Sequence, residues 1–536
     1  MPVLTLAGFK GANLRLQPQF VPDGVGTMSV NQRPPERGDF RPWRQPVAVS
    51  PAPTIPAGRQ TLYRMGREAT TPHQHWLSLT GVGHFMRDFV SNDTTERTIY
   101  TGSGTPKWTD NVIGLASAPY PTAARELAVP APTMAPIVTL TTDGPSGDAR
   151  QLYYYYTRVD DINRESAPSP PVLAPAAKPG AILDLTIGES VPAGNYGINR
   201  VRWYRQQVAG STAEFYFLRE YTVGASGMQD DARALGDLAP SEGWLEPPAD
   251  GAWLTECWNS FAAMLSGRTV RFCVPDVLYA WPLDFEYKLG AKPLALAQFA
   301  QRLLVLTSEG GEVFTGDHPS ALDQKPLALA TIVSQRGLVV GDTFAIWPAA
   351  DGLWYFGTDG YRNLVGGAML AEQWAALQPQ TMAGYLYELT ADDGTKRPLY
   401  IGFYNDGTLK GIVVDPSNPL GVYFLDKGYT AGYWDKLLRK LFVLDGSTLK
   451  EWDAPAGANM TASFTTGLRR QTTDVEAEWV ELLAEGPAAV KLWVDGELRL
   501  DETLDTGEHR THDGTAGREW QAQVTTSSPL LGAVIE

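Results

Sequence analysis

Paired carboxylates are the groups of this 536-residue sequence whose type and spacing first suggest chemistry. They occur at Asp160-Asp161, Asp230-Asp231 and Asp392-Asp393. Hydrolysis of a glycosidic bond needs two carboxyl groups that face each other across a cleft, and neighbours on one turn do not provide that geometry. A pair followed by glycine, as at Asp393-Gly394, is typical of a turn. These pairs therefore predict turns, although an enzyme that gathers acids from separate repeats remains an alternative.

The six histidines offer little for metal binding or general-base catalysis. His73 and His75 would point to one face of a strand and could begin a zinc site, but no third ligand stands nearby. His509 and His512, beside Asp513, lie in a polar stretch that is typical of a surface loop. The sequence also lacks the motifs of serine hydrolases, phosphate-binding loops, zinc peptidases and calcium-binding loops. We predict no catalytic residue, no metal site and no cofactor, and hence a protein that is not an enzyme.

Aromatic residues between 385 and 404 permit two interpretations. They could line a groove that binds sugars, or they could fill the interior of a β-sheet repeat, which their alternating pattern favours. The residues concerned are Tyr385, Tyr387, Tyr400, Phe403 and Tyr404.

The elements that must position these residues repeat between Leu294 and Asp453, roughly every 40 to 55 residues. Each repeat is an apolar run that meets a glycine-containing turn, and such two-residue turns permit positive φ at both central positions of a hairpin. The turns are Gly310-Gly311, Asp351-Gly352, Asp406-Gly407 and Asp445-Gly446. A four-strand unit with this period predicts a β-propeller-like array. We read Trp434-Asp435 and Trp452-Asp453 only as aromatic pairs that close such units.

Composition agrees with an all-β chain of several domains. The 53 glycines and 40 prolines suit many short strands joined by turns, and the only convincing helix is a short one over Met369–Leu377. We predict a β-propeller-like repeat array with an inserted β-sandwich and a C-terminal β-sandwich. The expected divisions are an extended proline-rich basic leader (1–57), the first strands of the propeller or platform (58–136), the insert (137–247), the propeller repeats (248–460) and the C-terminal sandwich (461–536).

Two cysteines, Cys257 and Cys273, are too few for a disulfide framework, and we expect buried thiols in a protein made in a reducing cytoplasm. No apolar run is long enough to cross a bilayer, and the first residues do not resemble a secretion signal.

The net charge of −16 argues against nucleic-acid binding through an extended basic surface. Residues 1–70 nevertheless carry nine Lys/Arg against four Asp/Glu, or +5, which leaves −21 for the remainder. The leader could be a solvated extended arm or an arm that docks on an acidic neighbour. Its candidate assembly contacts are Arg33, Arg37, Phe40, Arg41, Trp43 and Arg44, a set that interleaves arginines with aromatic anchors in a stretch rich in proline.

The insert resembles a fibronectin type III sandwich in three segments. These are the tyrosine-rich strand Tyr153–Val159, the turn Glu165–Pro170, and the strand Asn199–Arg205. Domains of that kind usually bind or space rather than catalyse.

An ordered series of segments resembles the tail tubular protein B, or tail nozzle, family of short-tailed bacteriophages. The series comprises Phe9-Lys10-Gly11, Asn31–Pro34, Ile99–Thr109, Ala280–Pro282, Leu303–Thr307, Gly316–Pro319, Ser334–Val339, Ala350–Leu353 and Gln373–Pro379. The second part of the leader pattern departs from the family's order, and no single segment decides the resemblance.

The resemblance implies a structural virion protein of the phage tail, assembled in the host cytoplasm. It implies a homohexameric ring that docks on the tail adaptor ring, meets tail fibres or a distal plug, and conducts genomic DNA through its bore without specific binding. An acidic bore would repel phosphates and let DNA slide. The alternative is a receptor- or glycan-binding propeller on a virion surface.

Overall fold

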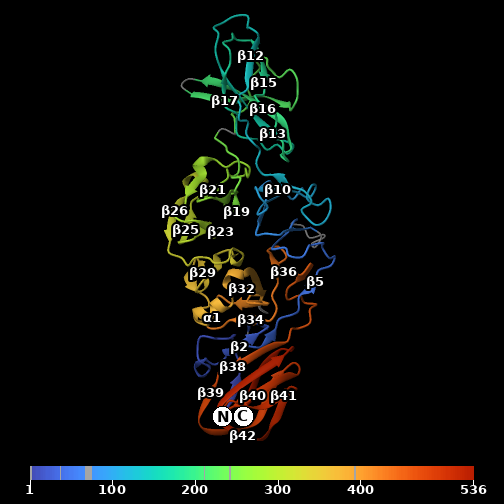
Figure 1. The fold of residues 1–536 in the computed structure, drawn as a ribbon, viewed down its shortest axis with the longest axis vertical. Coiled ribbons are helices and arrows are strands. Elements are labelled where there is room, and N and C mark those ends of the chain that lie inside the picture. The colour runs from blue at the N-terminus through green and yellow to red at the C-terminus, as the bar shows by residue number, and fades with distance from the viewer. Residues whose placement is uncertain (1–2, 37, 67–74, 210–211, 241–242, 391–393) are drawn as a thin grey trace. The chain divides into compact units, whose positions relative to one another are not determined.

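The computed structural model describes residues 3–36, 38–66, 75–209, 212–240, 243–390 and 394–536, and almost all of its regular structure is β-strand (Figure 1). The chain divides into two compact units. Unit 1 comprises Met1–Val82, Ala297–Glu312 and Pro326–Glu536, and unit 2 comprises Gly83–Leu296 and Val313–Lys325. Among the described residues, no helix is long and apolar enough to span a bilayer.

Unit 1 contains consecutive antiparallel groups of strands, the middle one part of a 12-stranded sheet, and their first strands β27, β31 and β35 pack side by side. The first sheet is β27 (Val339–Val340), β28 (Phe344–Ala349), β29 (Gly352–Gly357) and β30 (Gly360–Asn363). The next run of strands is β31 (Ala383–Thr390), β32 (Lys396–Asn405), β33 (Leu409–Val414) and β34 (Tyr423–Leu425). The third is β35 (Ala431–Asp435), β36 (Lys440–Asp445) and β37 (Thr448–Glu451), with β5 (Val47–Ala48) as its outer strand.

The same four-strand pattern occurs elsewhere in the chain. One such sheet is β23 (Pro293–Phe299), β24 (Arg302–Thr307), β25 (Gly310–Thr315) and β26 (Asp323–Leu327). Unit 2 adds β8 (His84–Arg87), β9 (Thr98–Thr101), β10 (Lys107–Thr109) and β11 (Arg125–Glu126), and then β19 (Ala252–Glu256), β20 (Ala262–Ser266), β21 (Thr269–Phe272) and β22 (Glu286–Lys288). A two-stranded pair is β6 (Thr61–Arg64) with β7 (Trp76–Leu79). The predicted all-β, propeller-like repeat fold is confirmed.

The predicted turns join consecutive strands. Gly407 and Gly446 have φ of 119° and 64°, whereas the aspartates before them do not have positive φ. Turns of this kind permit positive φ at both central positions, and in these two turns only the glycine uses that freedom.

The proline-rich leader is not a detached arm, which corrects the sequence interpretation. β1 (Leu4–Leu6) pairs with β43 (Leu530–Ile535), and β2 (Gly26–Val30) lies between β34 and β38 (Ala462–Thr466). β3 (Gln32–Arg33) pairs with β4 (Arg41–Pro42), and β5 completes the β35–β37 sheet. Proline is compatible with short edge strands, so its abundance did not exclude pairing.

The insert of unit 2 is a sandwich of two sheets (Figure 1). One sheet is β12 (Ile137–Thr142), β15 (Ile182–Thr186) and β18 (Gln229–Asp230). The other is β14 (Val172–Leu173), β13 (Tyr153–Asp160), β16 (Ile198–Ala209) and β17 (Thr212–Thr222). Leu183 and Leu185 are buried with Tyr154, Tyr156 and Trp203, so alternate residues of β15 face the core between the two sheets.

The C-terminal strands pack around one apolar cluster. They are β38, β39 (Arg469–Ala484), β40 (Ala488–Val494), β41 (Glu497–Leu504), β42 (Gly507–Thr526) and β43. β40 and β41 form a hairpin that turns at Asp495-Gly496. The predicted helix is α1 (Ala371–Ala376), and its buried Trp374 donates from Nε1 to the Ala349 carbonyl oxygen at 2.8 Å. Short 3-10 turns occur at Pro18–Phe20, Leu283–Phe285, Pro319–Ala321, Gln335–Gly337 and Pro379–Thr381.

Candidate functional site

The two aromatic residues predicted as assembly anchors are core residues of unit 1. Phe40 and Trp43 are each 0 % exposed. The ring of Phe40 lies 5.3 Å from that of Phe9, and the ring of Trp43 lies 5.6 Å from that of Trp452. Neither side chain can reach a partner without unfolding its surroundings, so this part of the prediction is corrected.

The leader arginines find acidic neighbours within their own chain. Arg33 pairs with Glu36 at 3.2 Å, and Arg41 pairs with Asp39. The backbone N–H of Arg44 donates to Asp453 Oδ1 at 3.1 Å. Arg33, Arg41 and Arg44 keep part of their surface exposed, so contacts with a partner through them stay a prediction; Arg37 lies outside the described residues.

Asp453 is a half-buried acid next to the leader. It accepts a hydrogen bond from the Tyr387 hydroxyl at 3.0 Å, and burial raises its pKa despite the positive charges of Arg33 and Arg44. The leader therefore contacts this acid within unit 1, through the backbone of Arg44 and near the charge of Arg33.

The carboxylate pairs are divided among separate ion pairs. Asp160 binds Arg164, whereas Asp161 binds Arg125. Asp230 binds Arg205, whereas Asp231 binds Arg233. Asp392 and Asp393 lie outside the described residues. The described pairs therefore stabilise the fold and do not face each other across a cleft.

The remaining candidates for chemistry are also dispersed. His73, and the side chains of His512 and Asp513, lie outside the described residues. No group of three or more possible metal-ligating side chains occurs in the described part of the chain. Tyr400, Phe403 and Tyr404 are at most 3 % exposed, and Tyr385 and Tyr387 pack against the same apolar clusters. The core interpretation of these aromatics is confirmed.

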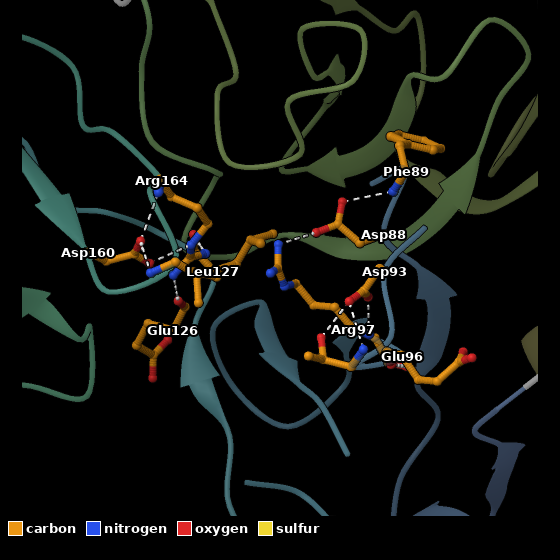
Figure 2. Close-up of polar contacts among 12 residues, drawn as sticks. Asp88, Phe89, Asp93, Glu96, Arg97, Glu126, Leu127, Asp160 and Arg164 are labelled. Atoms are coloured by element: carbon orange, nitrogen blue, oxygen red, sulfur yellow. Dashed lines mark hydrogen bonds and ion pairs between the residues drawn. The ribbon is translucent and has the colours of Figure 1, made fainter. Parts of the chain in front are cut away.

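Arg164 forms a buried polar network at the base of the insert, within unit 2 (Figure 2). Its Nε contacts Asp160 Oδ2 at 2.7 Å, and its Nη1 donates to the Leu127 carbonyl oxygen at 2.7 Å. The guanidinium carbon lies 5.0 Å from the centre of the Trp108 ring on β10. Because Leu127 directly follows β11, one side chain ties the insert to the β8–β11 sheet.

Arg97 supports the same tryptophan from the β8–β11 sheet. Its guanidinium carbon is 5.5 Å from the Trp108 ring centre, and its Nη1 contacts Asp88 Oδ2 at 3.0 Å. Burial opposes ionisation of Asp93, but hydrogen bonds from Thr95 and Arg97 leave its pKa below the usual value (Figure 2). Trp108 is therefore held in a fixed position by a charged sheet edge.

Arg158 holds the segment that enters the insert. It is 3 % exposed and donates from Nη1 to the carbonyl oxygens of Pro130 and Ala131, both at 3.1 Å. Its Nη2 pairs with Glu189 Oε1 at 2.9 Å, and hydrogen bonds from Thr133 together with this arginine lower the pKa of Glu189. The proline-rich linker is thus fastened to the sandwich.

Sequence reasoning missed this network because most partners of the arginines are backbone carbonyl groups. The only signal was the dense polar run Arg158–Glu165 directly after a tyrosine-rich strand. A run of this kind in a half-buried position requires partners, since buried charges are rarely left unpaired.

No protein-family model matches the sequence, and no curated protein matches it either. Solved structures with some similarity include BBS1N in complex with ARL6DN (14 % identity, 52 % of this chain, 85 % of that chain, TM-score 0.27). Others are the Pan2 WD40 domain of Neurospora crassa (11 % identity, 53 % and 85 %, TM-score 0.25) and the AfRom2 CNH domain (8 % identity, 61 % and 90 %, TM-score 0.26). At these TM-scores the similarity carries no argument about function.

Proposed function

We propose that this chain is a non-enzymatic structural protein of a short bacteriophage tail, a subunit of the ring at the distal end. The proposal rests on the ordered series of segments that resembles the tail nozzle family. It is supported by one structural observation above all, the anchoring of the inserted sandwich by Arg158 and Arg164. An insert held by buried arginines presents a rigid surface to a neighbour, whereas a flexibly linked insert does not.

In this proposal, six copies form a closed ring in which one face of each subunit meets a different face of the next. The ring receives the tail adaptor above and meets tail fibres or a plug below, and genomic DNA passes through its bore. The excess of acidic residues outside the first 70 residues, −21 in net charge, would reduce phosphate binding along that path. The protein would be assembled in the host cytoplasm and reside in the virion.

Sizing of the purified chain by light scattering and native mass spectrometry tests the proposal. Six subunits of 58.4 kDa give roughly 350 kDa, and negative-stain images should show rings. A monomer at every concentration, without rings when adaptor protein is added, would contradict the proposal.

A matched pair of variants asks whether the insert contributes to the ring. Leu173 on β14 is 43 % exposed and lies opposite Tyr153, whereas Leu437 in unit 1 is 60 % exposed on a turn. We expect Leu173→Glu to shift the particle toward smaller species and Leu437→Glu to leave its size unchanged. Equal behaviour of the two variants would exclude the insert from the subunit contacts.

The second candidate is a receptor- or glycan-binding propeller on a virion surface, which the observed propeller-like β fold supports better than it supports a tail ring. Its predicted aromatic groove is core, but a polar cavity of unit 1 offers another place for a ligand. Binding on a glycan array by a particle that stays monomeric would favour this candidate over the ring.

A further inference from the structure

A cavity of about 350 Å³ opens within unit 1 among strands of consecutive four-stranded sheets. Its volume is within the range of small-molecule sites, roughly 300–1,000 Å³. The residues that line it come from the segment before β28, from β31 and β32, and from β35 and the turn that follows it. Packed strands therefore hold most of its wall in place.

The inner part of this cavity is apolar. Phe344 and Leu386 are 7 % and 9 % exposed, and both belong to the core of unit 1. Trp434 is half-buried, and its ring makes a T-shaped contact with that of Tyr387, with 6.1 Å between the ring centres. These contacts fix the indole, so the cavity offers a preformed aromatic surface.

The outer part of the cavity is charged. Glu388 and Arg439 form an ion pair there, and Asp342, Lys396 and Lys436 complete the charged lining. Lys396 pairs with Thr390 through its backbone, but among the described residues no ion pair or hydrogen bond involves the side chain of Lys396 or of Lys436. The cavity thus carries more positive charge than its own carboxylates neutralise.

The other lysines of the β31–β37 region are paired. Lys410 binds Asp406 at 3.1 Å, and Lys427 and Lys450 both bind Asp445 at 2.8 Å. Lys440 binds Glu451 at 2.9 Å. Among the described lysines of this region, the side chains of Lys396 and Lys436 are therefore the exceptions, and both line the cavity.

We propose that this cavity binds an anionic saccharide, a pyranose that carries a carboxylate. The Trp434 indole would contact the apolar face of the sugar ring. Lys396 and Lys436 would donate charge-assisted hydrogen bonds to the sugar carboxylate. Asp342 and Glu388 would accept from sugar hydroxyl groups, because an ionised carboxylate only accepts. The ligand could be a free sugar acid or the end of an acidic polysaccharide, and both present the same chemistry.

Ligand-observed NMR with the full chain and D-glucuronate as probe tests the inference. D-glucose, which lacks the carboxylate, and inorganic phosphate, which lacks the sugar ring, are the matched ligands. We expect D-glucuronate to bind at least about tenfold more tightly than either, since each comparison removes one of the two recognised features. Equal binding of glucose would refute the role of the lysines, and equal binding of phosphate would refute the role of the aromatic surface.

Variants then locate the site. Lys396→Gln and Lys436→Gln should each weaken D-glucuronate binding by about threefold to tenfold, with Lys427→Gln as the control outside the cavity. All three lysines are exposed, so the fold should be retained, which circular dichroism can check. If the cavity variants bind like the control, the site is elsewhere and the inference fails. Particle size is a separate readout, so this failure leaves the ring proposal untouched.

A methyl ester of the probe tests the contribution of the carboxylate charge separately from that of the sugar ring. The methyl ester of D-glucuronate keeps the ring and hydroxyl groups but loses the charge, so it should bind no better than glucose. A short oligogalacturonate should bind at least as well as the monomer if the site takes the end of a polysaccharide, and weaker binding of the oligomer would restrict the ligand to free sugar acids.

Discussion

Replacement of Arg164 by methionine should release the insert from the β8–β11 sheet. The substitution leaves the Asp160 carboxylate fully buried without its guanidinium partner, and it frees the carbonyl oxygens of Leu127 and Glu126. Removal of one member of a buried ion pair costs about 3–5 kcal/mol of unfolding free energy. For a unit of this size, that loss corresponds to a fall in melting temperature of roughly 6–20 °C.

The assay combines thermal unfolding with hydrogen exchange, because two compact units need not unfold in one step. Exchange should accelerate in the peptides that contain Glu126–Leu127 and Asp160–Arg164, while β39–β42 of unit 1 should be unaffected. Arg233→Met is the control, since its ion pair with Asp231 is exposed and should be worth less than about 1 kcal/mol.

The double variant Asp160→Asn/Arg164→Met tests whether the loss of stability comes from the unpaired charge of the Asp160 carboxylate. An asparagine oxygen can still accept the N–H groups of Ile162 and Arg164, which Asp160 Oδ1 accepts at 3.1 and 2.8 Å. Removal of the unpaired Asp160 charge should therefore recover more than half of the unfolding free energy that the single variant loses. If the single variant melts like the Arg233→Met control, or the double variant is worse than the single, the network does not anchor the insert.

Three further predictions follow from buried groups. Deletion of residues 1–57 should prevent folding of unit 1, because β1, β2 and β5 are lost. Phe40→Ala and Trp43→Ala should each lower the free energy of unfolding by about 3–5 kcal/mol. A deletion variant that is soluble and melts cooperatively would contradict the role of the leader strands in the fold of unit 1. Cys257 and Cys273 should react with a thiol reagent more than about a hundredfold faster in denaturant than in the native protein. The reason is that burial raises the pKa of both thiols, that of Cys273 to about 12. Rapid labelling of the native protein would show that the thiols are not buried. Burial lowers the pKa of His84 to about 4, so its contribution to stability should be complete above pH 6.5 and lost as the pH falls toward 4, by about 3 kcal/mol at most. His84→Phe, which can keep the ring contact with Trp253 at 4.1 Å, should flatten that pH dependence, and an unchanged slope would assign it to other groups.

Local signals in the sequence predicted the local structure well. The turns at Asp406-Gly407 and Asp445-Gly446 and the short helix around Trp374 each involve residues close together in the chain. Periodicity and turn residues report such short-range structure directly. The all-β fold class could be predicted because it depends on the same short-range signals, namely the many short apolar runs and the turns between them.

Long-range structure could not be predicted in this way. Val30 pairs with Ser463, and Leu4 pairs with Ile535, and nothing in the leader's own composition indicates these partners. The prolines suggested an irregular arm, and Phe40 and Trp43 therefore looked like anchors for another protein. Their burial depends on clusters formed mostly by residues about 350 to 500 positions away, which short-range patterns do not reveal. The ring, its partners and its place in a phage tail stay predictions from the resemblance.

The pairing of β2 with β34 and β38 has a consequence for biosynthesis. During translation at about 5–20 residues per second, roughly 400 residues must follow β2 before its neighbours exist, a delay of about 20–80 s. Unit 2 has its own core and can fold in that interval, whereas the leader must wait with its apolar residues unburied. Exposed segments of this kind are where chaperones bind and aggregation begins. The yield of this protein in a heterologous host should therefore depend on the protection of its earliest strands during synthesis, at least as much as on the stability of the finished fold.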